Sequence, residues 1–219
     1  MPTPTRILIA DDHDIVRRGL RVLIETRADF EICGEAADGR TAVKLAQNTK
    51  PDVVLMDITM PLLNGLDATR QIRRAAPKVA ILIVSMHESE DVISDVIDVG
   101  AHGFLFKADA GRDLIAAIDA VREGRTFFAE RIAATMKRLR GTRPGAARPA
   151  KVPGAVTRRE REVLQLLAEG HSNKSVAHTL GISVKTAETH RARVMRKLEF
   201  ASLADLVRYA LRNRIVADL

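Results

Sequence analysis

The chain has 219 residues, 46% of them hydrophobic, which suits two small domains and gives each enough apolar side chains for a core. A single cysteine, Cys33, excludes an internal disulfide and fits a reducing cytoplasm, and no apolar run approaches the roughly 20 residues of a membrane-spanning helix. The net charge of +7 is unevenly divided: residues 1–130 hold 16 Lys and Arg against 21 Asp and Glu, and residues 131–219 hold 19 against 7.

The first 130 residues alternate short apolar runs with amphipathic segments. The N-terminus reaches acidic residues too early for a signal peptide, so we expect a cytoplasmic protein. Strands are predicted at residues 6–10, 31–36, 53–57, 80–85 and 103–107, and helices near residues 13–26, 39–48, 64–75, 89–99 and 111–122. Three of the strand-like runs are almost wholly apolar, as in parallel strands that helices cover on both faces. The pattern predicts an α/β fold, a doubly wound five-stranded parallel sheet.

The composition of the chain changes after about residue 130. A short helix is predicted near residues 129–139, and residues 141–155, with three Pro and three Gly, have the composition of a linker. The rest of the chain has only helical periodicity. We expect an all-α domain of four helices there, at residues 158–169, 173–180, 184–198 and 202–212.

Chemically active side chains follow four of the predicted strands. Asp11 and Asp12 come after the first strand, Asp57 ends the third, Ser85 the fourth and Lys107 the fifth. Each alone fits a turn former or helix cap, but right-handed crossovers bring all five to one rim of a parallel sheet. Three carboxylates there would repel one another without a cation, and oxygen ligands beside a phosphate favour Mg²⁺. The sequence therefore predicts a magnesium and phosphoryl site, with Lys107 and Ser85 as donors to phosphoryl oxygens.

The segments IADDHDIVRRGL, VVLMDITMPLLNGLD, VSMHE and GAHGFLFK resemble, in this order, the receiver domain of bacterial two-component response regulators over residues 5–121. The resemblance implies that Asp57 accepts a phosphoryl group from a sensor histidine kinase. It also implies that Asp11, Asp12 and Asp57 bind Mg²⁺, together with the backbone carbonyl of Thr59.

The same resemblance assigns a switch. Lys107 takes the place of the catalytic lysine and Ser85 that of the switch hydroxyl, which moves towards the new phosphoryl group. Phe104 takes the place of the switch aromatic, although an aromatic in a strand is equally expected as plain core. Pro61 and Gly65 would shape the loop after the phosphorylation site.

The basic C-terminal part carries the signals of a helix-turn-helix. Thr157, Ser172 and Ser183 are placed to cap three helices, and Gly181 provides the turn before the third, which would lie in the major groove. Val184, Val194 and Leu198 are expected to face inward. The side chains expected to contact DNA are Asn173, Lys174, Lys185, Thr186, Glu188, Thr189, His190, Arg191, Arg193 and Lys197.

The strings TRREREVL, LAEGHSNKSVA, ISVKT and THRARVMRKL resemble the LuxR-type DNA-binding domain over residues 153–217. With the receiver and a short helix and linker at 122–152, the chain resembles the NarL/FixJ family of response regulators. The resemblance implies a phosphorylation-controlled transcription factor that dimerises on an inverted repeat. Two questions stay open: Glu188 either accepts from a cytosine or pairs with a nearby arginine, and the apolar stripe of the last helix, Leu203 to Leu211, serves the domain core or also a dimer contact.

Other classes of function fit less well. A covalent phosphatase on this sheet would need a second Asp two residues after its nucleophile, where this chain has Thr59, so we expect no enzyme. RNA binding is disfavoured because one Tyr and no Trp leave little to stack on bases. A constitutive DNA-binding protein is disfavoured by the complete set of five strand-end residues. The resemblance further implies that the unphosphorylated receiver masks the DNA-binding or dimer surface.

Overall fold

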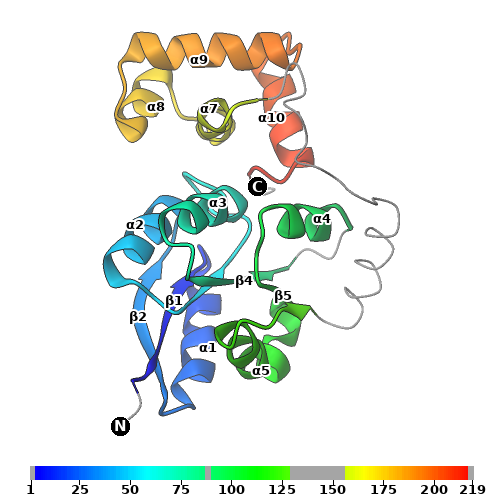
Figure 1. The fold of residues 1–219 in the computed structure, drawn as a ribbon. Helices are drawn as coiled ribbons and strands as arrows, with labels where there is room; N and C mark the ends of the chain where they lie inside the picture. Colours follow the sequence, from blue (N-terminus) through cyan, green and yellow to red (C-terminus); the bar gives the residue numbers. More distant parts are fainter. Residues whose placement is uncertain (1–2, 87–89, 129–155, 217–219) are drawn as a thin grey trace. The chain divides into compact units, whose positions relative to one another are not determined.

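The computed structural model describes residues 3–86, 90–128 and 156–216 (Figure 1). The chain divides into two compact units, one built around a β-sheet and one made of helices, and each is described by itself. The short helix expected near residues 129–139 and the linker expected at 141–155 lie outside the described residues.

The first unit is a parallel sheet with strand order β2-β1-β3-β4-β5-β6. Its strands are β1 (Thr5–Ala10), β2 (Phe30–Ala36), β3 (Val53–Met56), β4 (Ala80–Ser85), β5 (Gly103–Phe106) and β6 (Phe127–Phe128). The doubly wound α/β prediction is confirmed, but the count of five strands is wrong by one. The sixth strand is only two residues long, and it joins the edge of the sheet through a hydrogen bond from Phe127 N–H to the His102 carbonyl.

Helices cover both faces of this sheet. They are α1 (Asp14–Glu25), α2 (Gly39–Thr49), α3 (Gly65–Ala75), α4 (Glu90–Asp98) and α5 (Ala110–Arg122), with a 3₁₀ turn, η1 (Lys107–Asp109), between β5 and α5. Helices α1 and α5 lie on one face and α2, α3 and α4 on the other (Figure 1). Strands β3, β4 and β5 are buried along their whole length, which explains why their sequences are continuous apolar runs.

The second unit contains four helices, as predicted: α7 (Arg158–Ala168), α8 (Asn173–Leu180), α9 (Val184–Lys197) and α10 (Leu203–Arg212). Thr157 caps α7 in a capping box with Glu160, and Ser172 and Ser183 cap α8 and α9 through their side-chain oxygens. Gly181 ends α8 with a φ of +62°, a left-handed conformation that glycine adopts without strain. The sequence signals of the helix-turn-helix are therefore present in its geometry.

One predicted inward side chain of this unit is exposed. Val194 is buried and Leu198 half-buried, but Val184, the first residue of α9, is 42% exposed. In α10, Leu206 and Ala210 join the domain core, whereas Leu203 is 43% exposed. Of all the helices described in the two units, none is both long and apolar enough to cross a membrane.

Candidate functional site

The carboxyl ends of the central strands lie at one rim, as expected for parallel neighbours. Asp11 directly follows β1, and Asp57 follows β3, where its backbone N–H donates to the Ala10 carbonyl at 2.8 Å. Ser85 is the last residue of β4, and Lys107 is the first residue after β5. The sheet therefore brings together the strand-end residues that the sequence singles out.

Lys107 joins two of the carboxylates in the interior of the site. Its Nζ atom lies 2.6 Å from Asp11 Oδ2 and 2.9 Å from Asp57 Oδ2. All three side chains are 6% exposed or less. The other oxygen of Asp57, Oδ1, accepts a hydrogen bond of 2.8 Å from the backbone N–H of Ile58. Both oxygens of Asp57 are thus oriented by fixed donors.

Asp12 and His13 complete the cluster at its solvent-facing side. One ligand atom from each of Asp11, Asp12, His13 and Asp57 lies within 4.8 Å of the others. Three carboxylates and the Lys107 ammonium carry a formal charge of −2, which a divalent cation would neutralise. The three carboxylates of this group therefore fit Mg²⁺, which binds oxygen ligands. Sequence reasoning missed His13, although its position directly after two acidic residues was a usable signal.

The electrostatics of the cluster shift two pKa values. Burial raises the pKa of the Asp57 carboxyl to about 6; the Lys107 cation lowers it and the Asp11 charge raises it further. Burial alone would lower the pKa of the Lys107 ammonium, but the charges of Asp57 and Asp11 outweigh burial and hold it above its usual value. At neutral pH, Asp57 is therefore mostly an ionised carboxylate beside a fixed cation.

The start of α3 lies very close to the backbone of Asp57. Gly65, the first residue of α3, donates its N–H to the Ile58 carbonyl at 2.7 Å. A Cβ atom at Gly65 would lie 1.7 Å from the Asp57 carbonyl oxygen, so only glycine fits there. This agrees with the loop-shaping role expected for Gly65. Thr59, in the same loop, is half-buried.

The two expected switch residues are both inaccessible to solvent. Ser85 is fully buried at the end of β4. Phe104 in β5 is also fully buried and packs edge-on against Phe106, with ring centroids 5.0 Å apart. Because the Phe104 ring is already inside, this structure agrees with the core interpretation of that residue, and its switch role stays a prediction.

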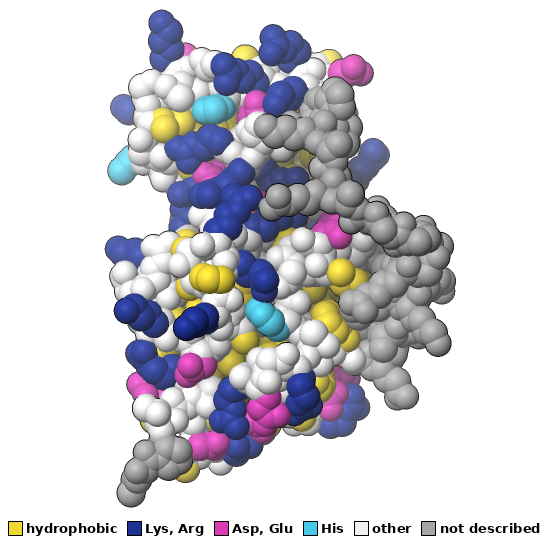
Figure 2. Space-filling view, viewed as in Figure 1, with side chains coloured by type: hydrophobic (Ala, Val, Ile, Leu, Met, Phe, Trp, Pro, Cys, Tyr) yellow, Lys and Arg dark blue, Asp and Glu magenta, His cyan; other side chains and the backbone are white. Residues whose placement is uncertain are grey.

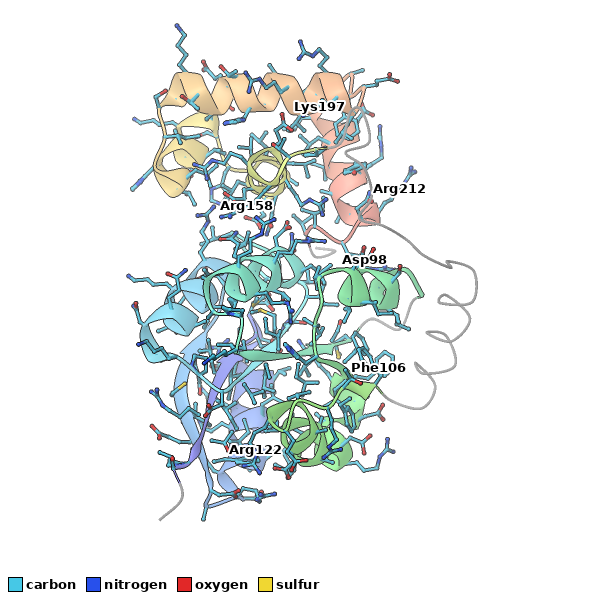
Figure 3. The ribbon with its side chains drawn as sticks, in the orientation of Figure 1. Asp98, Phe106, Arg122, Arg158, Lys197 and Arg212 are labelled. Carbon is cyan, nitrogen blue, oxygen red and sulfur yellow. The ribbon has the colours of Figure 1, made fainter. Side chains whose placement is uncertain are left out.

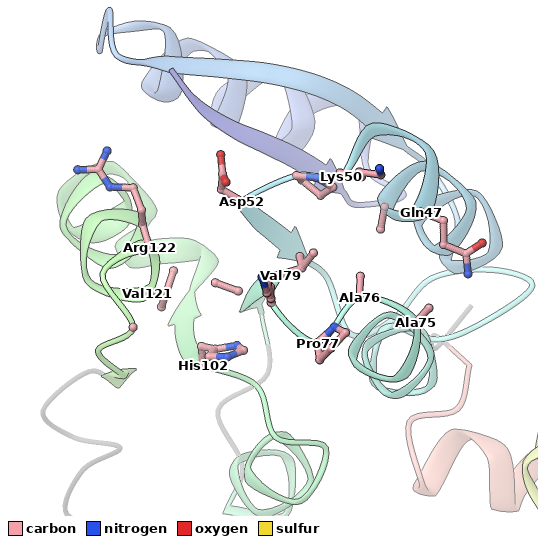
Figure 4. Close-up of a pocket in the computed structure, with 15 residues that line it drawn as sticks. Gln47, Lys50, Asp52, Ala75, Ala76, Pro77, Val79, His102, Val121 and Arg122 are labelled. Carbon is pink, nitrogen blue, oxygen red and sulfur yellow. The ribbon is translucent and has the colours of Figure 1, made fainter. Parts of the chain in front are cut away.

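The first unit also contains two hollows. One, of about 640 Å³, is lined by residues that include Lys50, Asp52, Pro77 and His102, none of them a predicted site residue (Figure 4). The other, of about 550 Å³, adjoins Lys107 and is lined mainly by apolar side chains of α1 and the start of α5. Only the second hollow adjoins the carboxylate cluster.

The predicted DNA-contacting side chains lie on α8 and α9. Lys174, Lys185, Thr186, Glu188, Thr189 and Arg193 are exposed, and Asn173, His190, Arg191 and Lys197 are half-buried. Lys and Arg side chains project from the helical unit around α9 (Figure 2). Glu188 is exposed, and no ion pair between it and Arg191 or Arg193 is found among the described residues, so both interpretations of Glu188 stay predictions.

Lys197, the last residue of α9 and labelled in Figure 3, forms an ion pair with a buried carboxylate. Its Nζ atom lies 2.7 Å from Glu160 Oε2, and the Glu160 side chain is only 3% exposed. The same oxygen accepts the backbone N–H of Thr157 at 2.8 Å. Burial acts to raise the pKa of the Glu160 carboxyl, but the hydrogen bonds from Lys197 and Thr157 outweigh burial and hold it below its usual value. Lys197 thus links α9 to the start of α7, and this structural contact accounts for the residue more directly than a phosphate contact does.

Comparison with known proteins extends these observations. Residues 7–119 match the response regulator receiver domain, and residues 155–210 match the bacterial regulatory proteins of the luxR family. The transcriptional regulatory protein MctR of Rhizobium johnstonii is 37% identical over 214 residues, which cover 98% of this chain and 96% of MctR.

Solved structures give the same result. A LuxR-family two-component response regulator from an Aurantimonas species is 37% identical with a TM-score of 0.60, over 64% of this chain and 99% of that one. A structure of two RcsB dimers bound to two parallel DNAs is 26% identical with a TM-score of 0.59, over 94% of this chain and 98% of that one.

Proposed function

The chain belongs to the NarL/FixJ family of two-component response regulators, a receiver joined to a LuxR-type DNA-binding domain, and we propose that phosphorylation of Asp57 controls its activity as a transcriptional regulator. The observation that carries this proposal is the pair of contacts from Lys107 to Asp57 and Asp11 at the sheet rim. These three charged side chains are buried together, and a structural role requires no such arrangement of charges.

The proposed chemistry is phosphoryl transfer to a carboxylate. A carboxylate oxygen of Asp57 attacks the phosphorus of a phosphohistidine on a sensor kinase, the P–N bond breaks, and the imidazole leaves with the electron pair and takes up a proton. Asp11, Asp12 and Asp57 would hold Mg²⁺, with the Thr59 carbonyl as a further ligand. When bound, Mg²⁺ supplies positive charge that neutralises the phosphoryl oxygens.

The residues of the chain supply positioning and charge. Lys107 holds Asp57 in place before the transfer and can exchange that contact for a phosphoryl oxygen afterwards. Ser85, one strand away at the same rim, is the proposed hydroxyl donor to the phosphoryl group. Its movement, with a change in the packing of Phe104, is the proposed switch.

For the helical unit we propose sequence-specific DNA binding through α9 in the major groove. Glu188 and Thr189 are the proposed base readers, and Lys185 and Arg193 are proposed phosphate contacts on its exposed side. A homodimer would read an inverted repeat, and RcsB, a relative in structure, binds DNA as dimers. A regulator of this kind, without catalytic turnover of a substrate, works in the bacterial cytoplasm.

The proposed function is tested by DNA selection and binding. Duplexes bound by the full chain are selected from a randomised library, and the enriched sequences show whether the site is an inverted repeat. The affinity for the selected duplex is then measured with and without acetyl phosphate and Mg²⁺. We expect acetyl phosphate to increase the affinity of the wild type and of Asp98→Asn, a matched exposed aspartate, but not that of Asp57→Asn. An equal response in Asp57→Asn would contradict the proposal.

The expected masking by the receiver has its own test. Residues 150–219 alone should bind the selected duplex more tightly than the unphosphorylated full chain. Equal binding by the two proteins would contradict masking while leaving Asp57 phosphorylation in place.

A further inference from the structure

The acidic site has an imidazole at its mouth, contributed by His13. We propose that His13 is a nitrogen ligand for a first-row transition-metal dication, so that this site binds ions such as Mn²⁺ and Co²⁺ in preference to Mg²⁺. The inference rests on the proposed function, in which the same carboxylates hold a dication, and it concerns which dication the chain selects.

The position of the ring suits a shared ion. His13 Nδ1 lies 2.8 Å from Asp12 Oδ1 and 3.4 Å from Asp11 Oδ1. In an octahedral shell with bonds of about 2.1 Å, neighbouring ligand atoms are roughly 3 Å apart and opposite ones roughly 4.2 Å. Both measured separations match those of neighbouring ligands. The ligand atoms of the four residues lie within 4.8 Å of one another, so they need to move together only slightly to reach the separation of opposite ligands.

The backbone holds His13 in this place. Its N–H donates to Asp11 Oδ1 at 2.9 Å, and the residue is the N-cap of α1. The ring is 64% exposed, so it can turn towards an ion at the mouth without disturbing the core, whereas Asp11 beneath it is fixed by Lys107. The site is therefore rigid inside and adjustable at the side where an ion arrives.

Ligand chemistry then sets the selectivity. Carboxylate oxygens suit Mg²⁺ and Mn²⁺ alike, but imidazole nitrogen favours first-row transition metals over Mg²⁺. The nitrogen also adds no charge, because a neutral imidazole leaves the balance of three carboxylates, one ammonium and one dication unchanged. His13 should raise affinity for transition metals and contribute little for Mg²⁺.

The test is calorimetric titration of the full chain with Co²⁺ and with Mg²⁺. We expect His13→Gln to weaken Co²⁺ binding by roughly tenfold or more and Mg²⁺ binding by less than about twofold. His178→Gln, which removes an exposed histidine of α8, should leave both affinities unchanged. Proton NMR of the Co²⁺ form should show a strongly shifted exchangeable imidazole resonance that His13→Gln lacks.

The outcomes separate this inference from the proposed function. Equal Co²⁺ affinity in His13→Gln and wild type overturns the proposal, and so does an equal loss for both ions, because His13 would then act only by orienting Asp11. Asp57→Asn should weaken the binding of both ions. A wild type that binds neither ion overturns the magnesium site itself.

Discussion

Replacing Gly65 by alanine places a methyl group where the Asp57 carbonyl oxygen already lies. The new Cβ would be 1.7 Å from that oxygen and 2.8 Å from the carbonyl carbon. Both atoms belong to the backbone, so no side-chain rotation relieves the clash. Restoring an ordinary contact needs a displacement of about 1.5 Å between the start of α3 and the backbone of Asp57.

The cost of this displacement can be compared with known classes of substitution. Forced repacking costs about 1–3 kcal/mol, and losing the hydrogen bond from Gly65 N–H to the Ile58 carbonyl adds roughly 1 kcal/mol. We expect Gly65→Ala to lower the free energy of unfolding of the sheet unit by about 3 kcal/mol. For a domain of this size, that corresponds to a fall in Tm of roughly 10 °C.

Differential scanning calorimetry of the full chain is the assay. The helical unit serves as an internal reference, because its transition should not move. Gly19→Ala is the matched control. Gly19 lies in α1, and a Cβ atom there would have nothing within 4 Å. Because alanine has the higher helix propensity, this substitution should raise the free energy of unfolding by about 0.5–1 kcal/mol. A Gly65→Ala protein that unfolds at or above the wild-type temperature would show that the sheet unit accommodates a Cβ atom at this position without cost.

Two further predictions concern other parts of the chain. Lys197→Met leaves the buried Glu160 carboxylate without its cation and should destabilise the helical unit by about 2 kcal/mol in urea unfolding. Lys185→Met, which replaces an exposed lysine, should instead weaken DNA binding with no loss of stability. Unchanged stability in Lys197→Met would refute the structural role. His102 lines the hollow shown in Figure 4. Burial, and then the Arg73 charge, lower the pKa of His102 from 6.5, and its Nδ1 accepts a hydrogen bond from the Ile81 N–H. The unfolded state therefore binds more protons than the folded state. The stabilisation from neutral His102 is present above pH 6.5 and is lost as the pH falls below it. The Tm difference between wild type and His102→Gln should therefore shrink from pH 7.5 to pH 5.5, and a constant difference would contradict this assignment.

The positions of the strand-end residues could be predicted from the sequence because the hydrophobic pattern determines where strands end. Asp11, Asp57, Ser85 and Lys107 each follow an apolar run, and parallel pairing of those runs leaves one rim for all of them. The direct contact of Lys107 with Asp11 needs side-chain geometry that no spacing contains. The strand β6 was missed because two residues carry no periodicity.

In the helical unit, periodicity predicts the face of a helix but not how far neighbours cover it. Val184 shares a face with Ala187 and Val194, yet Val184, the first residue of α9, is exposed. Lys197 has the charge and helix position of a phosphate contact, and only its distance to Glu160 reveals a second role. Such pairings between distant residues are set by tertiary packing, which local pattern does not determine.

Intact-mass spectrometry shows whether Asp57 accepts the phosphoryl group. The wild type, Asp98→Asn and Asp57→Asn are incubated with acetyl phosphate and Mg²⁺. We expect a gain of one phosphoryl mass in the first two proteins and none in Asp57→Asn. A phosphorylated Asp57→Asn, or an unmodified wild type, would contradict this expectation and favour DNA binding that is independent of phosphate.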